Sequence, residues 1–392
     1  MDTSAHIIVA GGGIGGLSLA QGLRKAGLRA TVLERDPSAG HRPQGYRISL
    51  KETGAAALRA CLPPNLYDLA VATSIRPATR MTFMDTRLVP KFSKDVPPQL
   101  PGVDGFGVNR LTLREILLAG LDVRFGTELT RYEPLPGDRV RAHLASGSTL
   151  DGDLLAGADG VGSRVRAQLL PDAVVDRLDW ALYGRTVLTP DLLAATPADL
   201  VDTFNRVTAP DHTAISVATC RPCAPVAEAA ARHAPDLELT DVPGYFSWTL
   251  TAPGPRPDDT SPAALHRLAL ATVAGWHEGV RRIVERADPE ATFLVHTHSA
   301  RRVRPWDEPA VTLLGDAVHS MSPGRGEGAN VALRDAHTLS AGLAAAAAAG
   351  RPLAEAKAAY EHAMLDYAFT AVEASLQQPF APFARPVRPP AR

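Results

Sequence analysis

Three glycines near the N-terminus have the spacing of a dinucleotide-binding turn. They satisfy the pattern G-x-G-x-x-G directly after a short β-branched run and at the start of a helix-like segment: Gly11, Gly13 and Gly16. Glycine permits the tight turn and lets backbone N–H groups approach a pyrophosphate at the positive end of the helix. Glu34 ends a second apolar run, where an acidic side chain can bind the adenosine ribose hydroxyls. The segment predicts a bound dinucleotide, although it does not by itself separate FAD from NAD.

A second group of small residues lies far downstream, after another strand-like run. The run 311–314 leads into Gly315-Asp316, and the pattern Pro-x-x-Gly-x-Gly-x-Asn follows at Pro323, Gly326, Gly328 and Asn330. A third segment contains Asp159-Gly160, which by itself is only a good turn pair. Taken alone, the downstream segment also fits an ordinary glycine-rich turn in which Asp316 caps a helix.

Together these segments resemble the FAD-dependent aromatic hydroxylase family, the single-component flavoprotein monooxygenases typified by 4-hydroxybenzoate hydroxylase. In that family the Asp of a Gly-Asp motif binds the ribityl chain, and the Pro-x-x-Gly-x-Gly-x-Asn segment lies beside the flavin ring. The resemblance covers residues 6–50, 109–166 and 310–345. It implies that small residues let the backbone lie along the isoalloxazine edge. The helix N-terminus near Ala329 would then stabilise negative charge on the reduced flavin.

The motifs and the resemblance together imply a set of cofactor-binding residues, with no catalytic side chain and no metal ligand. Arg47 is expected to face the flavin or its phosphates, and Arg110 lies where the family has an FAD-contacting arginine. In an arginine-rich chain, however, either residue is also consistent with a solvated surface group. The expected cofactor contacts are Gly11, Gly13, Ile14, Gly15, Gly16, Glu34, Arg35, Arg47, Arg110, Leu129, Asp159, Asp316, Pro323, Gly326, Gly328, Ala329 and Asn330.

The sequence departs from the family pattern in the downstream loop. Ser320 stands where the family often has Pro, and Arg325 and Glu327 add charges to a loop that is usually neutral. We expect Arg325 and Glu327 to pair with each other and to point outward. If they faced the flavin instead, its redox behaviour would be unusual.

The composition excludes several other classes of protein. A net charge of −1 over 392 residues lacks the basic bias of a nucleic-acid binder. Three cysteines suit a reducing compartment rather than a disulfide framework. No apolar run approaches the roughly 18–20 residues of a membrane span, and the N-terminus lacks the basic region of a secretory signal. We therefore expect a cytoplasmic protein that neither spans a membrane nor binds nucleic acid.

The order of the expected elements predicts an α/β fold with an α+β insert. The resemblance implies a Rossmann-like FAD-binding domain with an inserted β-sheet substrate domain, a 4-hydroxybenzoate hydroxylase-like fold, and C-terminal helices. The expected parts are a discontinuous FAD-binding domain at 1–72, 102–176 and 299–378, a substrate-binding domain at 73–101 and 177–298, and a disordered tail at 379–392.

The resemblance also implies the reaction. FAD would be bound tightly without a covalent link, and NADPH or NADH would bind only transiently because no second nucleotide fingerprint is left over. NAD(P)H would reduce the flavin, and O₂ would add to give a flavin C4a-hydroperoxide. This species would hydroxylate or epoxidise an aromatic, an alkene or another electron-rich small molecule, in secondary metabolism or aromatic catabolism. A monomer or a homodimer is expected.

Substrate contacts are expected on the strands of the insert. The candidates are Tyr183, Arg185, His212, Tyr245 and Trp248. Two other functions remain open: a redox-silent or non-oxidative FAD-binding scaffold or cyclase of the same fold, and a flavin-dependent halogenase. The four tryptophans are too far apart to form the Trp-x-Trp-x-Ile-Pro segment of halogenases. An NAD-dependent dehydrogenase without flavin fits the downstream motifs less well.

Three further signals predict structure rather than chemistry. Cys220-Arg-Pro-Cys223 has no second cysteine pair for zinc and no separate domain for a thioredoxin motif, so a loop with two incidental thiols is expected. His296 and His298 are expected to pack where the insert rejoins the flavin-binding body. His319 follows the Gly-Asp motif and is expected to be structural.

Overall fold

The N-terminal residues form the strand–turn–helix–strand unit that their pattern predicts. The computed structural model describes residues 5–41 and 46–377, and in it every residue of β1 (His6–Ala10) is buried. α1 (Ile14–Lys25) begins just after the glycine turn, and β2 (Arg29–Leu33) returns parallel to β1. Because a parallel return requires a crossover connection, α1 packs against the sheet that these strands begin.

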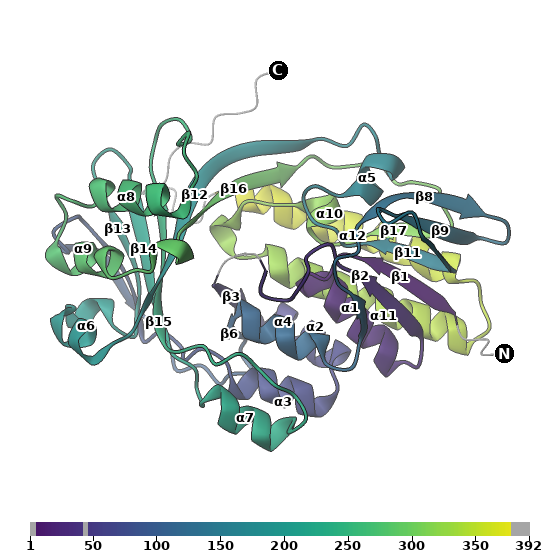
Figure 1. Cartoon of the computed structure of the whole chain (residues 1–392), viewed down its shortest axis with the longest axis horizontal. Coiled ribbons are helices and arrows are strands. Elements are labelled where there is room, and N and C mark those ends of the chain that lie inside the picture. The colour runs from purple at the N-terminus through teal and green to yellow at the C-terminus, as the bar shows by residue number, and fades with distance from the viewer. Residues whose placement is uncertain (1–4, 42–45, 378–392) are drawn as a thin grey trace.

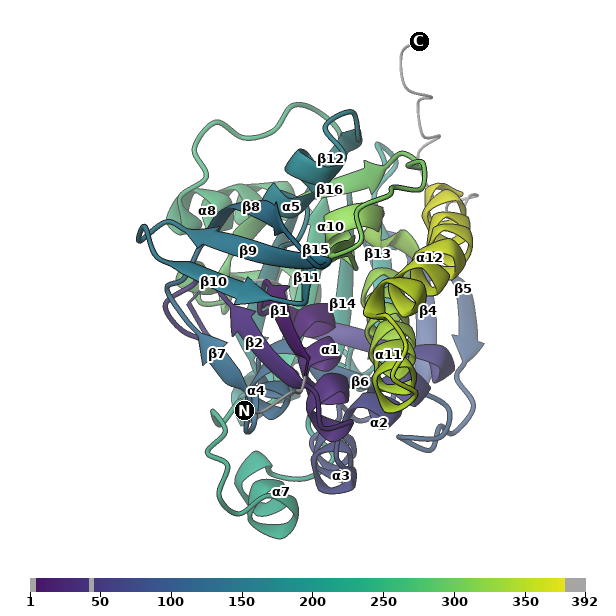
Figure 2. The same cartoon turned by 90° about the vertical axis from the view of Figure 1, so that its right-hand side faces the viewer.

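This unit belongs to a five-stranded parallel sheet with the order β17-β11-β1-β2-β7. The strands that extend it come from three later parts of the chain: β7 (Asp122–Arg124), β11 (Leu154–Gly157) and β17 (Val311–Leu313). The long C-terminal helices α11 (Gly328–Ala348) and α12 (Leu353–Leu376) lie with α1 on one side of this sheet (Figure 2). A three-stranded sheet lies on the other side, formed by β8 (Leu129–Leu135), β9 (Arg139–Leu144) and β10 (Thr149–Gly152).

A second sheet of seven strands has the order β16-β12-β15-β14-β13-β4-β5. Its strands are β4 (Arg80–Met84), β5 (Pro90–Asp95), β12 (Val175–Val187), β13 (Phe204–Thr208), β14 (Ala214–Cys220), β15 (Tyr245–Thr251) and β16 (Phe293–Ala300). One face buries alternate apolar residues, among them Phe246 and Trp248, in a separate core. The helices that cover this face are α6 (Pro190–Ala195), α8 (Pro262–Thr272) and α9 (Glu278–Glu285). The other face turns toward the parallel-sheet body (Figure 1).

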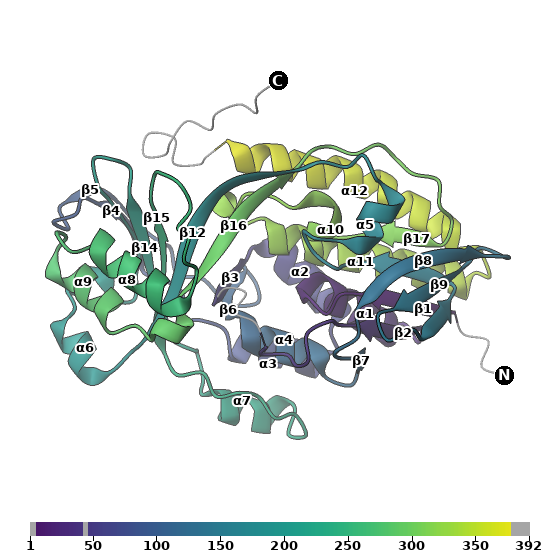
Figure 3. The same ribbon diagram turned by 45° about the horizontal axis from the view of Figure 1, so that its top comes forward.

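Two strands join the bodies. β12 and β16 run side by side from the seven-stranded sheet into the parallel-sheet body (Figure 3). The remaining elements are β3 (Arg47–Leu50), α2 (Glu52–Cys61), α3 (Pro64–Ala72), β6 (Phe106–Asn109), α4 (Arg110–Leu118), α5 (Arg164–Leu169), α7 (Val226–His233) and α10 (Asp316–His319), with short 3₁₀ turns at Ala198–Leu200, Pro289–Ala291 and Pro323–Arg325. The predicted α/β body with an inserted β-sheet and C-terminal helices is confirmed.

Within 5–41 and 46–377, no helix combines the length and the apolar character that crossing a bilayer requires. The predicted disordered tail, 379–392, lies outside the described residues.

Candidate functional site

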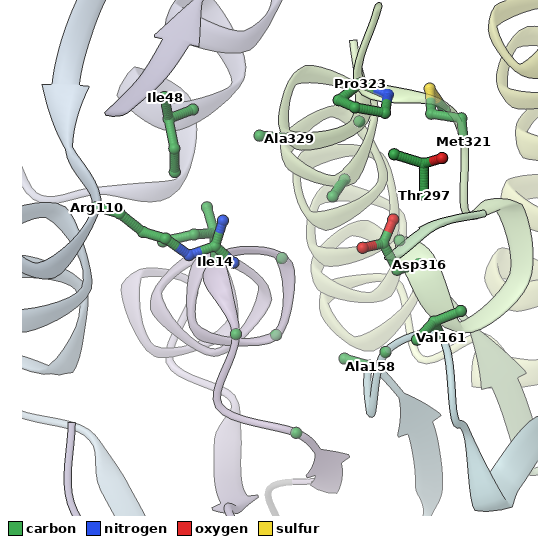
Figure 4. Close-up of a pocket in the computed structure, with 18 of the residues that line it drawn as sticks. Ile14, Ile48, Arg110, Ala158, Val161, Thr297, Asp316, Met321, Pro323 and Ala329 are labelled. Carbon is green, nitrogen blue, oxygen red and sulfur yellow. The ribbon is translucent and has the colours of Figure 1, made fainter. Parts of the chain in front are cut away.

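A cavity of about 900 Å³ opens between the two bodies (Figure 4). This volume is within the usual range for cofactor and ligand sites. Glycine-rich turns and the segment 314–332 form one side, and the inner face of the seven-stranded sheet forms the other. The predicted cofactor contacts that line the cavity are Gly11, Gly13, Ile14, Gly15, Gly16, Glu34, Arg35, Arg47, Arg110, Leu129, Asp159, Asp316, Pro323, Gly326, Gly328 and Ala329.

The start of α1 meets this cavity without a capping side chain. Gly13 is the N-cap residue, and a Cβ built on it meets no protein atom within 4 Å. Gly11 has a φ of +109°, and a Cβ there would lie 2.3 Å from the Ala158 carbonyl oxygen, so this position accepts only glycine. The helix N–H groups are thus available to an anion such as a pyrophosphate, and the lack of a side chain at Gly13 leaves room for it.

Glu34 is held at the cavity wall by a buried ion pair. Its Oε2 accepts hydrogen bonds from the Gly12 N–H at 3.0 Å and from Arg114 Nη2 at 2.8 Å. Arg114, on the inner side of α4, also donates to the Gly12 carbonyl oxygen at 3.0 Å. Because both partners are about 95% buried, the pair ties the glycine turn to α4 and fixes the carboxylate in place.

Asp159 lines the cavity at the turn before α5, but its carboxylate bonds within the fold. It accepts hydrogen bonds from the Ser163 hydroxyl and, at 2.7 Å, from the Arg164 N–H. The side chain therefore fixes the shape of the turn and caps the first turn of α5. A ligand that bound to the Asp159 carboxylate would therefore share it with the first turn of α5.

Arg110 and Asp316 reach into the cavity from opposite walls (Figure 4). Arg110 is the first residue of α4, and Asp316 is the first residue of α10. Burial lowers the pKa of Arg110, and the carboxylate of Asp316 raises it. The two opposite charges therefore interact across the cavity.

A buried polar network lies behind Asp316. Asp335 on α11 accepts hydrogen bonds from the Gly315 N–H at 2.9 Å and from the Tyr367 hydroxyl at 2.7 Å. His319 pairs with the same carboxylate. The structural role predicted for His319 fits this arrangement, because the side chain supports the turn that presents Asp316.

Asn330 is the one predicted cofactor contact that does not line the cavity, and its contact with the cofactor stays a prediction. Its Nδ2 donates to the carbonyl oxygens of Ser49 at 3.0 Å and Gly326 at 2.8 Å, and its Oδ1 accepts from the Lys51 N–H at 2.8 Å. The reason is its place in the first turn of α11, where side chains point back toward the helix start. Asn330 thus ties together two segments that line the cavity.

The predicted pairing of Glu327 with Arg325 is wrong. Glu327 pairs with Lys51, because the start of α2 packs against α11 and brings Lys51 within reach. Neither Arg325 nor Glu327 lines the cavity. Both line a separate groove instead.

The sheet side of the cavity is a polar face that runs across neighbouring strands. Tyr183 on β12 is opposite Thr249 on β15, Thr249 is opposite Ser216 on β14, and Ser216 is opposite Arg206 on β13. All four line the cavity. Arg206 Nη1 donates to the Ser216 hydroxyl at 3.1 Å, and burial lowers the pKa of its guanidinium.

Arg206 has no carboxylate within ion-pair distance among the described residues. Burial also raises the pKa of Tyr183, so its phenol stays protonated and can donate a hydrogen bond. A half-buried guanidinium with only a hydroxyl partner favours a ligand that carries an acidic oxygen. Arg206 is therefore suited to bind an anionic group.

Of the substrate contacts predicted on the insert strands, only Tyr183 lines the cavity. Trp248 and Tyr245 are buried, and His212 lies exposed in the β13–β14 turn. The guanidinium carbon of Arg185 lies 5.3 Å from the ring centroid of Tyr46 and 6.0 Å from that of Tyr245. The insert residues that the prediction missed are Asp179, Trp180, Ala181, Phe204, Arg206, Ser216, Ala218, Ser247, Thr249, Thr251 and Thr297. The alternation of polar and apolar residues in 245–251 was the signal that could have found those on β15.

The cysteine and histidine pairs stay outside the cavity. Cys220 is buried, which raises the pKa of its thiol to about 11, while Cys223 is exposed. The rings of His296 and His298 lie edge to face at 6.3 Å on β16, where the insert rejoins the parallel-sheet body. Among the described residues, no three His, Cys, Asp or Glu side chains gather as metal ligands would.

The chain is similar to known flavoproteins over most of its length. A family model described as an FAD binding domain matches residues 246–375, and one described as an NAD(P)-binding Rossmann-like domain matches 9–68. The dual O-methyltransferase/FAD-dependent monooxygenase elcB of Phaeosphaeria nodorum is 34% identical over 377 residues, which cover 87% of this chain and 40% of that protein. The chain therefore spans less than half the length of that relative.

Two solved structures share the fold. A protein from Photorhabdus luminescens described as an FAD-containing monooxygenase is 32% identical, with a TM-score of 0.80 over 95% of this chain and 97% of that one. Klebsiella pneumoniae HpxO, solved with FAD and uric acid, is 23% identical, with a TM-score of 0.76 over 96% of this chain and 88% of that one.

Proposed function

The chain belongs to the FAD-dependent aromatic hydroxylase family, and we propose that it is a monooxygenase that uses FAD, NAD(P)H and O₂ to hydroxylate or epoxidise an electron-rich small molecule. The observation that carries this proposal is the cavity between the two bodies. It has glycine-lined helix starts on one side and a polar sheet face on the other. A nucleotide cofactor and a small substrate would therefore meet between them.

The glycine turn fits the pyrophosphate of a dinucleotide, because a side chain at Gly13 would occupy the space that it needs. We assign the pyrophosphate to the start of α1, the adenosine ribose to Glu34, and the ribityl hydroxyls to Asp316. α11 also starts at the cavity without a capping side chain, and Gly328 and Ala329 line the wall there. This helix start would stabilise negative charge on a reduced flavin ring.

Bound FAD would supply the electron transfer and the activation of O₂. The residues of this chain would hold and orient the reactants and exclude water from them. Tyr183 would donate a hydrogen bond from its phenol to a substrate oxygen, and Arg206 would bind an acidic oxygen of the same molecule. The proposed substrate is thus an acidic aromatic compound or enol.

We propose that one body binds FAD and the other binds the substrate. Residues 1–72, 102–176 and 299–378 would bind FAD, and residues 73–101 and 177–298 would bind the substrate. The cysteines described as free suit a reducing compartment, and we propose a cytoplasmic location on that ground.

The test is the colour of the purified protein. It should be yellow and release FAD on denaturation, and anaerobic NADPH or NADH should bleach it until air is admitted. Protein that is colourless and does not retain added FAD would refute the proposal. A flavin that neither nicotinamide reduces, even with acidic phenols present, would favour the redox-silent scaffold.

A further inference from the structure

The polar row across the cavity continues outward beyond Arg206 as an aromatic pair. Arg206 on β13 is opposite Phe83 on β4, and Phe83 is opposite Phe92 on the edge strand β5. Residues opposite each other on neighbouring strands point to the same face of a sheet. The two phenylalanines therefore lie on the face that lines the cavity, and their ring centroids are 5.9 Å apart.

This outer end of the row is apolar and partly open to solvent. Phe83 is buried, but Phe92 is 47% exposed, and neither residue lines the cavity itself. Each strand adds about 4.8 Å, so the backbone of Phe92 is roughly 10 Å beyond that of Arg206. From β12 to β5, the row thus carries hydroxyl groups first, then the guanidinium of Arg206, and then the two aromatic rings.

The edge strand is poorly suited to pairing with a second copy of this chain. Pro90 lacks an N–H group, and an antiparallel copy that pairs Phe92 with Ser93 would bring Lys91 opposite Lys94. Proline and lysine at a sheet edge oppose strand addition. The exposed ring is therefore better matched to part of a small molecule that already occupies the neighbouring cavity.

We propose that the substrate is amphiphilic: its acidic oxygen pairs with Arg206, and an apolar chain next to that oxygen leaves the cavity along the row and reaches the exposed ring of Phe92. This inference rests on the proposed function, because it takes the cavity to be the substrate site. It adds that recognition extends beyond the cavity and depends on the length of the apolar chain.

The experiment measures binding of two probes to the FAD-loaded protein, from the change in flavin absorbance. The probes are 2,4-dihydroxybenzoates that carry a methyl or a pentyl group at position 6, next to the carboxylate. The pentyl compound should bind about tenfold more tightly or better, because its added methylene groups leave water. Phe92→Ser should remove most of that difference and leave the Kd of the methyl compound within about twofold.

Val89→Ser is the matched control, because Val89 is 52% exposed in the same hairpin but is not part of the row. It should keep the preference for the pentyl compound. Equal Kd values in the unmodified protein, an unchanged preference in Phe92→Ser, or no binding of either probe would each overturn the inference. Bleaching of the flavin by NAD(P)H is measured separately, so the inference can fail while the proposed function stands.

Discussion

His319 Nε2 lies 2.6 Å from Asp335 Oδ2, and neither side chain is exposed to solvent. The same carboxylate accepts hydrogen bonds from the Gly315 N–H and the Tyr367 hydroxyl. A buried charge with several donors holds its neighbours firmly, because each donor would be left unpaired without it. Asp335 thus fixes the turn that presents Asp316 to the cavity.

Asp335→Asn should destabilise the protein strongly. The change removes the charge that balances His319, and breaking a buried pair typically costs about 3–5 kcal/mol. Urea unfolding of the purified protein would measure the loss. Asp366→Asn is the control, because Asp366 forms an exposed pair with Arg302 and its loss should matter little. Equal stability of the two variants would contradict the central role given to Asp335.

The stabilising effect of His319 should depend on pH. Burial lowers the pKa of His319, but the charge and hydrogen bond of Asp335 outweigh it, so the folded-state pKa lies above the ordinary value. A group with a raised folded-state pKa contributes its full stabilisation at pH values below its pKa in the unfolded chain, which is about 6.5 for histidine. This stabilisation is lost as the pH rises through the folded-state pKa. The advantage of the unmodified protein over His319→Gln in unfolding free energy should therefore shrink above about pH 6.5. An advantage that grows with pH would show that the folded-state pKa of His319 is lowered rather than raised.

Gly13→Ala should weaken FAD binding without lowering stability much. The added methyl group would meet no protein atom and would project toward the proposed pyrophosphate site. Gly11→Ala should instead lower the stability itself, because its φ is +109° and its Cβ would collide with Ala158. Thermal unfolding and FAD titration of both variants separate the two effects. Gly275→Ala is the control, because its added methyl group also meets no protein atom. If Gly13→Ala bound FAD as tightly as Gly275→Ala does, the pyrophosphate would not lie at the start of α1.

Asp316→Ala should lower the affinity for FAD by about tenfold or more, the usual value of hydrogen bonds to a charged group. Fluorescence titration of the apoprotein with FAD would measure it. Asp172→Ala removes another exposed carboxylate, in a turn away from the cavity, and should change nothing. Full affinity in Asp316→Ala would mean that the ribityl chain is held elsewhere.

Arg206→Gln should raise KM for acidic aromatic substrates by about tenfold or more, because a neutral amide does not replace a charged pair. The effect should be small for neutral analogues of the same shape. Steady-state oxidation of NAD(P)H with both kinds of compound gives the comparison. Arg267→Gln, an exposed change on α8, serves as the control. An equal rise of KM for acidic and neutral compounds would exclude a role for Arg206 in binding an anion.

The sequence was sufficient for the parts of the site that depend on local sterics. Gly11 and Gly13 could be identified because the backbone of a tight turn excludes side chains wherever that turn occurs. Glu34 could be placed because it comes directly after the strand that follows α1. These residues are close in the chain, so their relative position follows from one strand–turn–helix unit.

The parts that depend on contacts between distant segments could not be predicted. Asn330 bonds to Ser49 and Lys51, and the pairing of Glu327 with Lys51 arises from the same packing of α2 on α11. Arg206 is one arginine among many, and only the register of β13 with β14 and β4 reveals which way it points. The prediction for Trp248 rested only on its place on an insert strand, which does not say which face of the sheet it occupies. Its position in the alternation of β15 turns it toward the helices.

The parallel sheet pairs strands from distant parts of the chain, so the site can form only late during synthesis. β1 is made before the other strands of this sheet, its neighbour β11 is made much later, and β17 borders β11 only after Val311–Leu313 has emerged. The seven-stranded sheet can begin earlier, because β13, β14 and β15 follow one another and pair as antiparallel neighbours. Asp316 joins last. The cavity therefore cannot take its final shape before residue 332 has been made. Until β17 is available, the edge of β11 that pairs with it stays open to pairing with other strands.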